Sequence, residues 1–212
     1  MRFWNRVRYQ AILFDFDGVL VDSEPVHFEC WREILRDFDV PLDWQTYCRH
    51  GIGVSDRDLM ALLCQRAARP FEVDRLLAQY PRKKEMFRTR MLERNAISLD
   101  VMELLRALSG YQLGVVTSSG RTEVEPILEK AGIDGLFRAV VYGGDVQRLK
   151  PAPDPYLLAV QKLGVRSALA LEDSDAGETS ARAAGLDVLR VPASAQMPEL
   201  LRAHLELTSS GA

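Results

Sequence analysis

The stretch that decides the fold is Ala11–Ser23, which reads AILFDFDGVLVDS. Its first part, Ala11–Phe16, is almost continuously apolar, which is typical of a strand covered on both faces of a sheet. Alternation along a strand places Asp15 and Asp17 on the same side. Two carboxylates at such short range repel each other, so the pKa of one of them rises unless a cation lies between them. This arrangement suits a nucleophile beside a general acid or base.

The aspartate pair has two alternative interpretations, a calcium-binding loop and an Asx-type turn. An EF-hand loop needs glycine at its sixth position and glutamate at its twelfth. Counted from Asp15, Gly18 stands at the fourth position, so the calcium interpretation fails on spacing. A turn capped by aspartates stays open for this segment taken alone.

Four further apolar runs resemble strands, and helical patterns separate them. The runs are Gln112–Thr117, Ala139–Tyr142, Ala168–Glu172 and Asp187–Val191. The helical patterns are Val101–Leu108, Glu123–Ala131, Pro155–Leu163 and Ala176–Ala184, and Gly132, Gly164 and Gly185 fall where helix C-caps belong. Alternating strands and helices predict an α/β fold with a parallel sheet and right-handed crossovers.

The segment between the first and second predicted strands carries helical patterns and no strand signal. The patterns cover Pro25–Phe38, Ser55–Arg66, Glu72–Gln79 and Arg82–Arg94, and Pro81 should break the helix between the last two. We therefore expect a helical domain inserted after the first strand. The predicted boundaries are 24–96 for the insert and 1–23 with 97–212 for the α/β core.

Two segments offer groups that bind anions. Thr117 and Ser118 follow the second predicted strand, and hydroxyls with free backbone N–H groups at a strand-to-helix junction make an anion site. Plain N-capping of the next helix is the alternative. Lys150 lies in the run RLKPAPD, whose prolines hold the chain extended, so its ammonium can point into a site. A solvated surface lysine is the alternative there.

A fourth segment offers metal ligands. Glu172 and Asp173 follow the fourth predicted strand and precede a helix. Carboxylates, together with water and phosphate oxygens, are what Mg²⁺ prefers. Acids that favour the helix macrodipole are the alternative, and Asp175 is better placed for that role.

The four segments follow successive strands of one predicted sheet. In an open parallel sheet, ligands bind at the carboxyl ends of the strands. We therefore expect a nucleophile, hydroxyls, an ammonium and acids along one edge. The alternative explanations would have to hold for all four segments at once and in a consistent order, and we reject them.

The composition is that of an ordinary globular protein. The chain has 212 residues, 47% hydrophobic and 27% charged, with a formal net charge of −3. That charge disfavours a nucleic-acid partner, and no apolar run approaches the ~18 residues that span a bilayer. The first residues do not resemble a signal peptide. Three irregularly spaced cysteines, Cys30, Cys48 and Cys64, indicate free thiols in a reducing compartment, and we expect the cytoplasm.

With these motifs the chain resembles the haloacid dehalogenase superfamily over nearly its whole length. DFDGVLVDS, VVTSS, the lysine of LKPAP and LEDSDAG match in order. Within it the chain looks like the β-phosphoglucomutase-like and phosphoglycolate phosphatase-like branch, and the similar positions are Ser23, Glu24, His27, Trp31 and Gly53-Val54-Ser55. The resemblance implies a Rossmann-like core with helices on both faces of the sheet and an inserted helical cap domain.

The resemblance also implies roles by position. Asp15 would attack phosphorus and form an aspartyl phosphate, and Asp17 would protonate the leaving oxygen and then activate water. Thr117, Ser118 and Lys150 would hold the transferring phosphoryl group. Mg²⁺ would be bound by Asp15, the Asp17 carbonyl, Asp173 and, directly or through water, Glu172. The implied phosphate- or substrate-binding residues are Gly18, Thr117, Ser118, Lys150, His27 and Arg57.

One departure from the family pattern concerns the cap. In the mutase, an arginine shortly after Gly-Val-Ser grips the phosphate that is not transferred. Asp56 stands at that position here, and a carboxylate there would repel a second phosphate, which favours a phosphatase over a mutase. The alternative is a shift of one residue that lets Arg57 take the role of the arginine. His27 has two interpretations, a group that couples cap closure to the protonation of Asp17, or a satisfied hinge histidine.

We therefore expect a Mg²⁺-dependent phosphatase that hydrolyses a small, sugar-phosphate-like monoester. A β-phosphoglucomutase-type sugar-phosphate mutase is the main alternative, and a non-catalytic phospho-acceptor receiver is a remote one. The expected partner is a small phosphorylated metabolite, with neither nucleic acid nor membrane. The sequence leaves open whether the chain is a monomer or a small homo-oligomer.

Overall fold

The structure is a computed structural model, and it describes residues 8–52, 56–66, 72–94 and 96–210. The chain divides into two compact units. One consists of Met1–Asp22 with Asn95–Ala212, and the other is Ser23–Arg94. Within the described ranges, no helix combines the length and the apolar character needed to cross a bilayer.

The first unit is built on a five-stranded parallel sheet of order β3-β2-β1-β4-β5. Its strands are β1 (Ala11–Phe14), β2 (Gln112–Val116), β3 (Phe137–Val141), β4 (Ala168–Glu172) and β5 (Asp187–Arg190). The predicted parallel α/β fold is thereby confirmed. The strand predicted to run to Phe16 ends at Phe14, because the chain turns tightly there and Asp17 forms a bridge with Val21.

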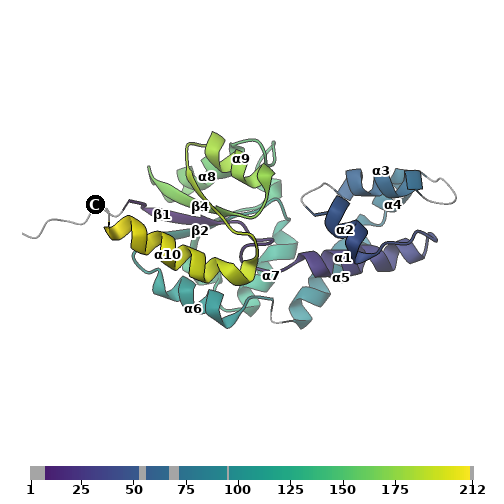
Figure 1. Cartoon of the computed structure of the whole chain (residues 1–212), viewed down its shortest axis with the longest axis horizontal. Helices are drawn as coiled ribbons and strands as arrows, with labels where there is room; N and C mark the ends of the chain where they lie inside the picture. Colours follow the sequence, from purple (N-terminus) through teal and green to yellow (C-terminus); the bar gives the residue numbers. More distant parts are fainter. Residues whose placement is uncertain (1–7, 53–55, 67–71, 95, 211–212) are drawn as a thin grey trace, which may run out of the picture. The chain divides into compact units, whose positions relative to one another are not determined.

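In the described part of this unit, five helices cover the sheet. They are α6 (Leu99–Ala107), α7 (Arg121–Lys130), α8 (Asp154–Leu163), α9 (Asp175–Ala183) and α10 (Met197–Ser210). Figure 1 shows α8 and α9 on one face of the sheet and α6 with α10 on the other. Short 3₁₀ turns occur at Asp134–Leu136, Gly143–Asp145 and Ser194–Gln196. The predicted glycine stops Gly132, Gly164 and Gly185 have positive φ, and Gly164 caps α8 in the left-handed region that glycine tolerates.

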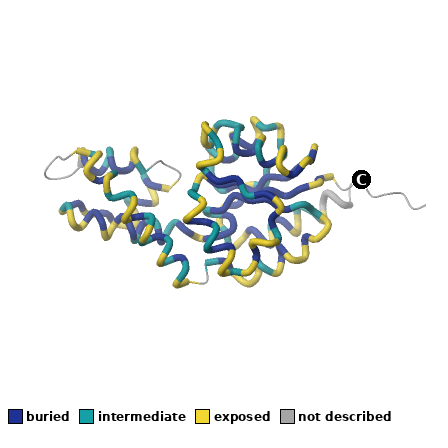
Figure 2. Tube along the Cα trace, turned by 180° about the vertical axis from the view of Figure 1, so that it is seen from behind, coloured by how far each residue is buried: buried dark blue, intermediate teal, exposed yellow. Residues whose placement is uncertain are grey.

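Burial in the sheet explains its sequence pattern. All residues of β1 and β4 are buried, as Figure 2 shows in dark blue, which accounts for their continuous apolar runs. β5 differs, because both of its end residues, Asp187 and Arg190, are exposed and the two between are half-buried. It is an edge strand and has a neighbour on one side only.

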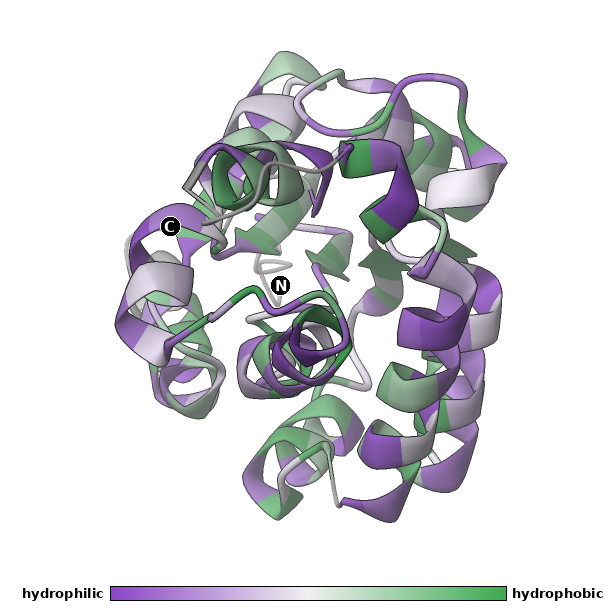
Figure 3. Cartoon of the chain, turned by 90° about the vertical axis from the view of Figure 1, so that its right-hand side faces the viewer, coloured by the Kyte–Doolittle hydropathy of each residue, from purple (hydrophilic) through white to green (hydrophobic). Residues whose placement is uncertain are grey.

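The second unit is helical. It contains α1 (Glu24–Arg36), α2 (Trp44–His50), α3 (Asp56–Arg66), α4 (Val73–Leu77) and α5 (Tyr80–Glu93). Its core is lined by Phe28, Trp31, Ile34, Leu35, Leu59, Met60, Leu63 and Leu76. Figure 3 shows green and purple residues side by side along single helices, as expected when one stripe of each helix is buried.

Ion pairs join the first and last helices of this unit in antiparallel order. In the middle of α1, Glu29 pairs with Arg94, the residue after α5, at 2.9 Å. Farther along, Glu33 pairs with Arg90, and beyond the end of α1 Asp37 pairs with Arg82 at 2.6 Å. The two helices therefore run antiparallel, with the middle of α1 beside the end of α5 and the end of α1 beside the start of α5.

The helices of this unit differ from the predicted ones at α2 and at the start of α5. Helix α2 was not predicted, since its seven residues bury only Tyr47 and show no apolar period. Pro81 does not break a helix. It lies in the first turn of α5, where its missing N–H is not needed, so α5 begins at Tyr80 and not at Arg82. The Gly53-Val54-Ser55 positions lie outside the described residues.

Candidate active site

Asp15 lies just past the end of the central strand. Its backbone N–H donates to the carbonyl of Leu171 at 3.0 Å, which extends the pairing of β1 with β4 by one residue. Only 7% of the residue is exposed. Its Oδ1 accepts a hydrogen bond from the Phe16 N–H at 2.7 Å and lies 3.0 Å from Nζ of Lys150. The carboxylate is therefore buried, oriented and paired with one cation.

The turn after Asp15 requires glycine. Gly18 has φ of 73°, and its N–H donates to the carbonyl of Val21 at 2.9 Å. A Cβ at this position would lie 2.0 Å from Oδ2 of Asp173. The backbone at Gly18 therefore packs against the acidic segment that follows β4, and any side chain there would push that carboxylate away.

Lys150 connects three strand ends. Its Nζ donates to the Val116 carbonyl at 2.9 Å and lies 2.6 Å from Oε1 of Glu172, in addition to its contact with Asp15. Burial by itself lowers the pKa of Lys150, but the carboxylates of Asp15 and Glu172 outweigh it, and the pKa lies above its usual value. The lysine therefore stays charged in a dry environment.

Three carboxylates form the acidic part of the site. Asp15, Glu172 and Asp173 each offer a carboxylate oxygen, and these oxygens lie within 4.8 Å of one another. Burial, and then the charge of Glu172, hold the pKa of Asp15 well above its usual range. Oε2 of Glu172 is buried and has no hydrogen-bond partner among the described residues. Hard oxygen donors with one unsatisfied oxygen fit a divalent cation such as Mg²⁺.

The three hydroxyl residues after β2 differ in their contacts. Thr117 is buried, and its Oγ1 accepts a hydrogen bond from the Ser119 N–H at 3.0 Å. Ser118 is exposed. Ser119 donates its hydroxyl to Oδ2 of Asp17 at 2.7 Å. The sequence analysis singled out Thr117 and Ser118 and missed Ser119, although the run of three hydroxyls was a usable signal.

Tyr156 was also missed. It lies in α8, is fully buried and donates its hydroxyl to Oε1 of Glu172. Burial, and then the charge of Glu172, raise the pKa of this phenol well above its usual value, so it remains a donor. No sequence signal marked it, since a tyrosine on the buried stripe of a helix is ordinary core.

His27 lies in the helical unit, within α1. Its Nδ1 is 2.7 Å from Nζ of Lys83, and its ring stacks on Phe87 with centroids 4.1 Å apart. Lys83 is 3% exposed. Inside its own unit, His27 therefore has the contacts of a satisfied, packed histidine. A role in the reaction stays a prediction.

Asp56 and Arg57 lie at the start of α3 in the same unit. Oδ1 of Asp56 accepts a hydrogen bond from the Trp31 indole at 2.7 Å, and Oδ2 lies 3.6 Å from Nζ of Lys83. Arg57 is exposed, and its guanidinium lies 3.4 Å from Asp74. Asp56 thus neutralises part of the charge of the buried Lys83. The guanidinium of Arg57 is exposed to solvent and pairs with Asp74.

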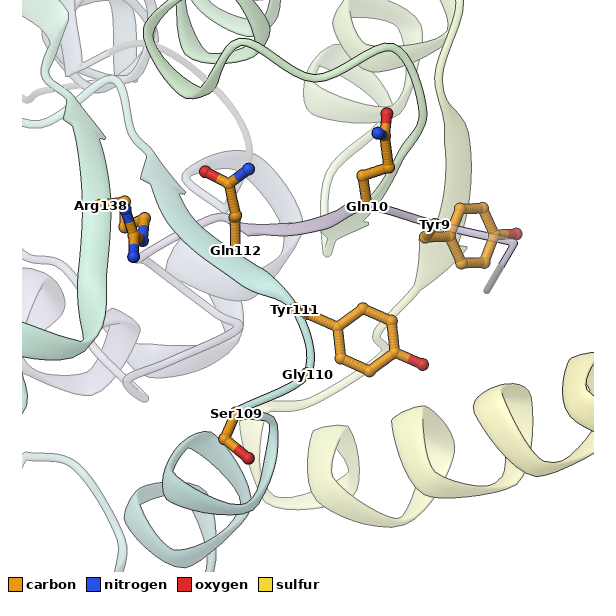
Figure 4. A pocket seen from close by; sticks show the side chains of 7 residues that line it. All are labelled: Tyr9, Gln10, Ser109, Gly110, Tyr111, Gln112 and Arg138. Carbon is orange, nitrogen blue, oxygen red and sulfur yellow. The ribbon is translucent and has the colours of Figure 1, made fainter. Parts of the chain in front are cut away.

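A pocket of about 400 Å³ lies at the opposite edge of the sheet (Figure 4). It is formed at the amino ends of β1, β2 and β3 by Tyr9, Gln10, Ser109, Gly110, Tyr111, Gln112 and Arg138. Figure 4 shows the side chains of Gln10 and Gln112 extending in one direction and the ring of Tyr111 in another. The predicted reactive residues are not among those that line it.

Comparisons with known proteins identify a family and several relatives. Residues 12–191 match the family model described as haloacid dehalogenase-like hydrolase. The fructose-1-phosphate phosphatase YqaB of Escherichia coli is 32% identical over 87% of this chain and 97% of its own length. The β-phosphoglucomutase of Bacillus subtilis is 27% identical over 84% of this chain and 80% of its own. The crystal structure of CbbY from Rhodobacter sphaeroides with phosphate has a TM-score of 0.70 at 27% identity, covering 85% of this chain and 84% of its own.

Proposed function

Because this chain belongs to the haloacid dehalogenase-like hydrolase family, we propose that it is a Mg²⁺-dependent phosphatase of small, sugar-phosphate-like monoesters, acting through an aspartyl phosphate on Asp15. The observation that carries the proposal is the buried carboxylate of Asp15, 3.0 Å from the ammonium of Lys150 and grouped with Glu172 and Asp173. The family assignment sets aside the receiver alternative.

In the first half-reaction, a carboxylate oxygen of Asp15 forms a bond to phosphorus and the ester P–O bond breaks. The leaving oxygen takes a proton from Asp17. In the second half, a water oxygen bonds to phosphorus, its proton goes to Asp17, and the bond between Asp15 and phosphorus breaks. Inorganic phosphate leaves, and both carboxyl groups return to their starting states.

Positioning and electrostatics supply the remaining stabilisation. Lys150 offsets negative charge on the phosphoryl oxygens, and Thr117, Ser118 and the backbone at Gly18 are proposed to contact them. Ser119 supports the orientation of Asp17 through its 2.7 Å hydrogen bond.

Mg²⁺ would be held by carboxylates of Asp15, Glu172 and Asp173 and by the carbonyl of Asp17. When bound, it offsets the repulsion between these acids and an incoming phosphate. We expect excess chelator to stop phosphate release and added Mg²⁺ to restore it. Full activity in excess chelator would contradict the metal assignment.

The proposed substrate class draws on the names of the relatives and on the cap. One relative is named for fructose 1-phosphate, which makes that compound the first substrate to test. Asp56 disfavours a second phosphate, because its carboxylate would repel one and it already pairs with Lys83. We propose His27 and Arg57 as substrate-contacting residues of the cap.

One reaction separates the phosphatase from the mutase. With β-glucose 1-phosphate, Mg²⁺ and a catalytic amount of glucose 1,6-bisphosphate, we expect free phosphate to form faster than glucose 6-phosphate. Both products are followed in the same sample. Rapid formation of glucose 6-phosphate with almost no free phosphate would instead establish the mutase, and Arg57 would become the residue to test.

We also propose a cytoplasmic enzyme that is a monomer or a small homo-oligomer. Support for a reducing compartment comes from Cys30, Cys48 and Cys64, which are all free thiols. Size-exclusion chromatography with light scattering tests the oligomeric state.

A further inference from the structure

We propose that Tyr156 is a positioning residue that fixes the carboxylate of Glu172 so that Oε2 is presented to the divalent cation. The inference rests on the proposed function. It concerns a side chain with a single polar atom, on helix α8, buried beneath the acidic cluster.

Two hydrogen-bond donors converge on one carboxylate oxygen of Glu172. The hydroxyl of Tyr156 and the ammonium of Lys150 both donate to Oε1 of Glu172, the latter at 2.6 Å. With both donors in place, the carboxylate plane has little freedom to rotate. The ammonium also lies 5.4 Å from the centre of the Tyr156 ring, so one tyrosine contacts both charged groups.

The other carboxylate oxygen of Glu172, Oε2, supports the same inference. Oε2 of Glu172 is buried without a hydrogen-bond partner among the described residues, and such an oxygen is costly unless a ligand satisfies it. A Cβ at Gly177 would lie 1.9 Å from Oε2, so the first turn of α9 leaves room for this oxygen only because residue 177 is a glycine. Glu172 also belongs to the group of three carboxylates that could hold a cation.

The substitution Tyr156→Phe distinguishes the role of the Tyr156 hydroxyl from that of its ring. Tyr156→Phe would keep the buried ring and its face toward Lys150, and would remove one O–H donor. Among the described residues, Lys150 would then be the only donor left on Oε1, while it also contacts Asp15 and the Val116 carbonyl. Glu172 would gain rotational freedom, and loss of such a supporting contact typically weakens metal binding about 10- to 100-fold.

The experiment measures Mn²⁺ binding to the full-length protein directly, from the EPR signal of the free ion. Tyr156→Phe should weaken Mn²⁺ binding by about tenfold or more, and saturating Mg²⁺ should restore most of the phosphatase activity. The matched control is Tyr9→Phe, since Tyr9 is also buried and donates to a carboxylate, Asp187, at 2.9 Å, but at the opposite edge of the sheet. Its Mn²⁺ affinity should equal that of the wild type.

Equal Mn²⁺ affinity in the wild type and both variants would overturn the role of Tyr156 and leave the proposed function standing. A wild type that binds no Mn²⁺ would overturn the metal site, and this inference with it. If Tyr156→Phe does not fold, 4-aminophenylalanine at position 156 restores a donor on the same ring. Wild-type affinity in that variant supports the inference, and tenfold weaker binding contradicts it.

Discussion

The two ends of the parallel strands, which we call the carboxyl edge and the amino edge of the sheet, differ in the groups that they bury. The carboxyl edge buries charged groups. Asp15 and Glu172 are 7% and 0% exposed, and the side chain of Lys150 is 6% exposed. At the amino edge, the pocket of Figure 4 is a hollow whose lining includes half-buried and exposed groups such as Tyr111 and Arg138. The same strands supply both edges, so the contrast comes from the loops that follow each strand.

The contrast shows that buried charge identifies the reactive edge and that a hollow does not. Burying an ion costs several kcal/mol unless partners compensate for it. At the carboxyl edge, two of the three grouped carboxylates, those of Asp15 and Glu172, share the ammonium of Lys150, which leaves excess negative charge in a largely buried place. At the amino edge, exposed groups such as Arg138 can be hydrated, and the buried Tyr9 is a neutral phenol that donates to Asp187.

The largest expected effect tests the nucleophile at the carboxyl edge. Asp15→Asn should lower the rate of phosphate release by on the order of a thousandfold or more, because the nearly isosteric amide cannot attack phosphorus. Circular dichroism should show an intact fold. Asp134→Asn, a change of the same kind at an exposed position, is the control. Substantial turnover in Asp15→Asn would rule out a covalent intermediate on this residue.

A smaller effect is expected for the serine that the sequence analysis missed. Ser119→Ala removes the donor to Oδ2 of Asp17 and should lower kcat about tenfold, the value of one hydrogen bond. KM should change little, because the bond orients the acid and not the substrate. Ser119→Thr keeps a hydroxyl and should recover most of the rate. Unchanged kcat in the alanine variant would show that Asp17 needs no such support.

At the amino edge, the expected effect is on stability and not on catalysis. Burial, and then the bond to Asp187, raise the pKa of Tyr9 to about 12 from 10.0, with Arg8 and His204 beside it. The neutral phenol is therefore favoured in the fold, and its contribution is complete below pH 10 and lost as the pH rises toward 12. Tm of the wild type should fall more steeply across this window than Tm of Tyr9→Phe. Tyr111→Phe should behave like the wild type, and equal slopes for all three would refute the assignment.

The smallest effect is expected in the hollow itself. Arg138 is exposed and has no ion pair among the described residues. Arg138→Ala should change kcat/KM by less than about twofold, as surface substitutions usually do. A large loss of activity would show that the amino edge participates in the reaction.

Much of the fold was predictable because β2, β3 and β4 are short, mostly apolar runs, each followed by a helix with a glycine just after it. The site was predictable for a related reason. Parallel strands bring their carboxyl ends together, so the order of Asp15, Thr117, Lys150 and Glu172 along the chain already implies one edge. Grouping of Asp15, Lys150 and Glu172 in the structure follows from that topology.

The parts that were missed depend on local geometry or on long-range packing. Which of three consecutive hydroxyls reaches Asp17 depends on the turn after β2, and only Ser119 does so. Tyr156 meets Glu172 because α8 packs on the sheet, a contact between residues that no period in the sequence links. Helix α2 is too short to show an apolar period at all.

The antiparallel pairing of α1 with α5 has a consequence for how the chain folds. Strands β1 and β2 pair although about 100 residues separate Ala11 from Gln112, and closing a flexible loop costs about 0.6 kcal/mol more for each doubling of its length. The contact of Glu29 with Arg94 brings the two ends of the insert together. Once the helical unit has formed, β1 and β2 meet through a much shorter effective loop. Changes in the length of the segments between α1 and α5 therefore add almost nothing to the entropy cost of forming the sheet.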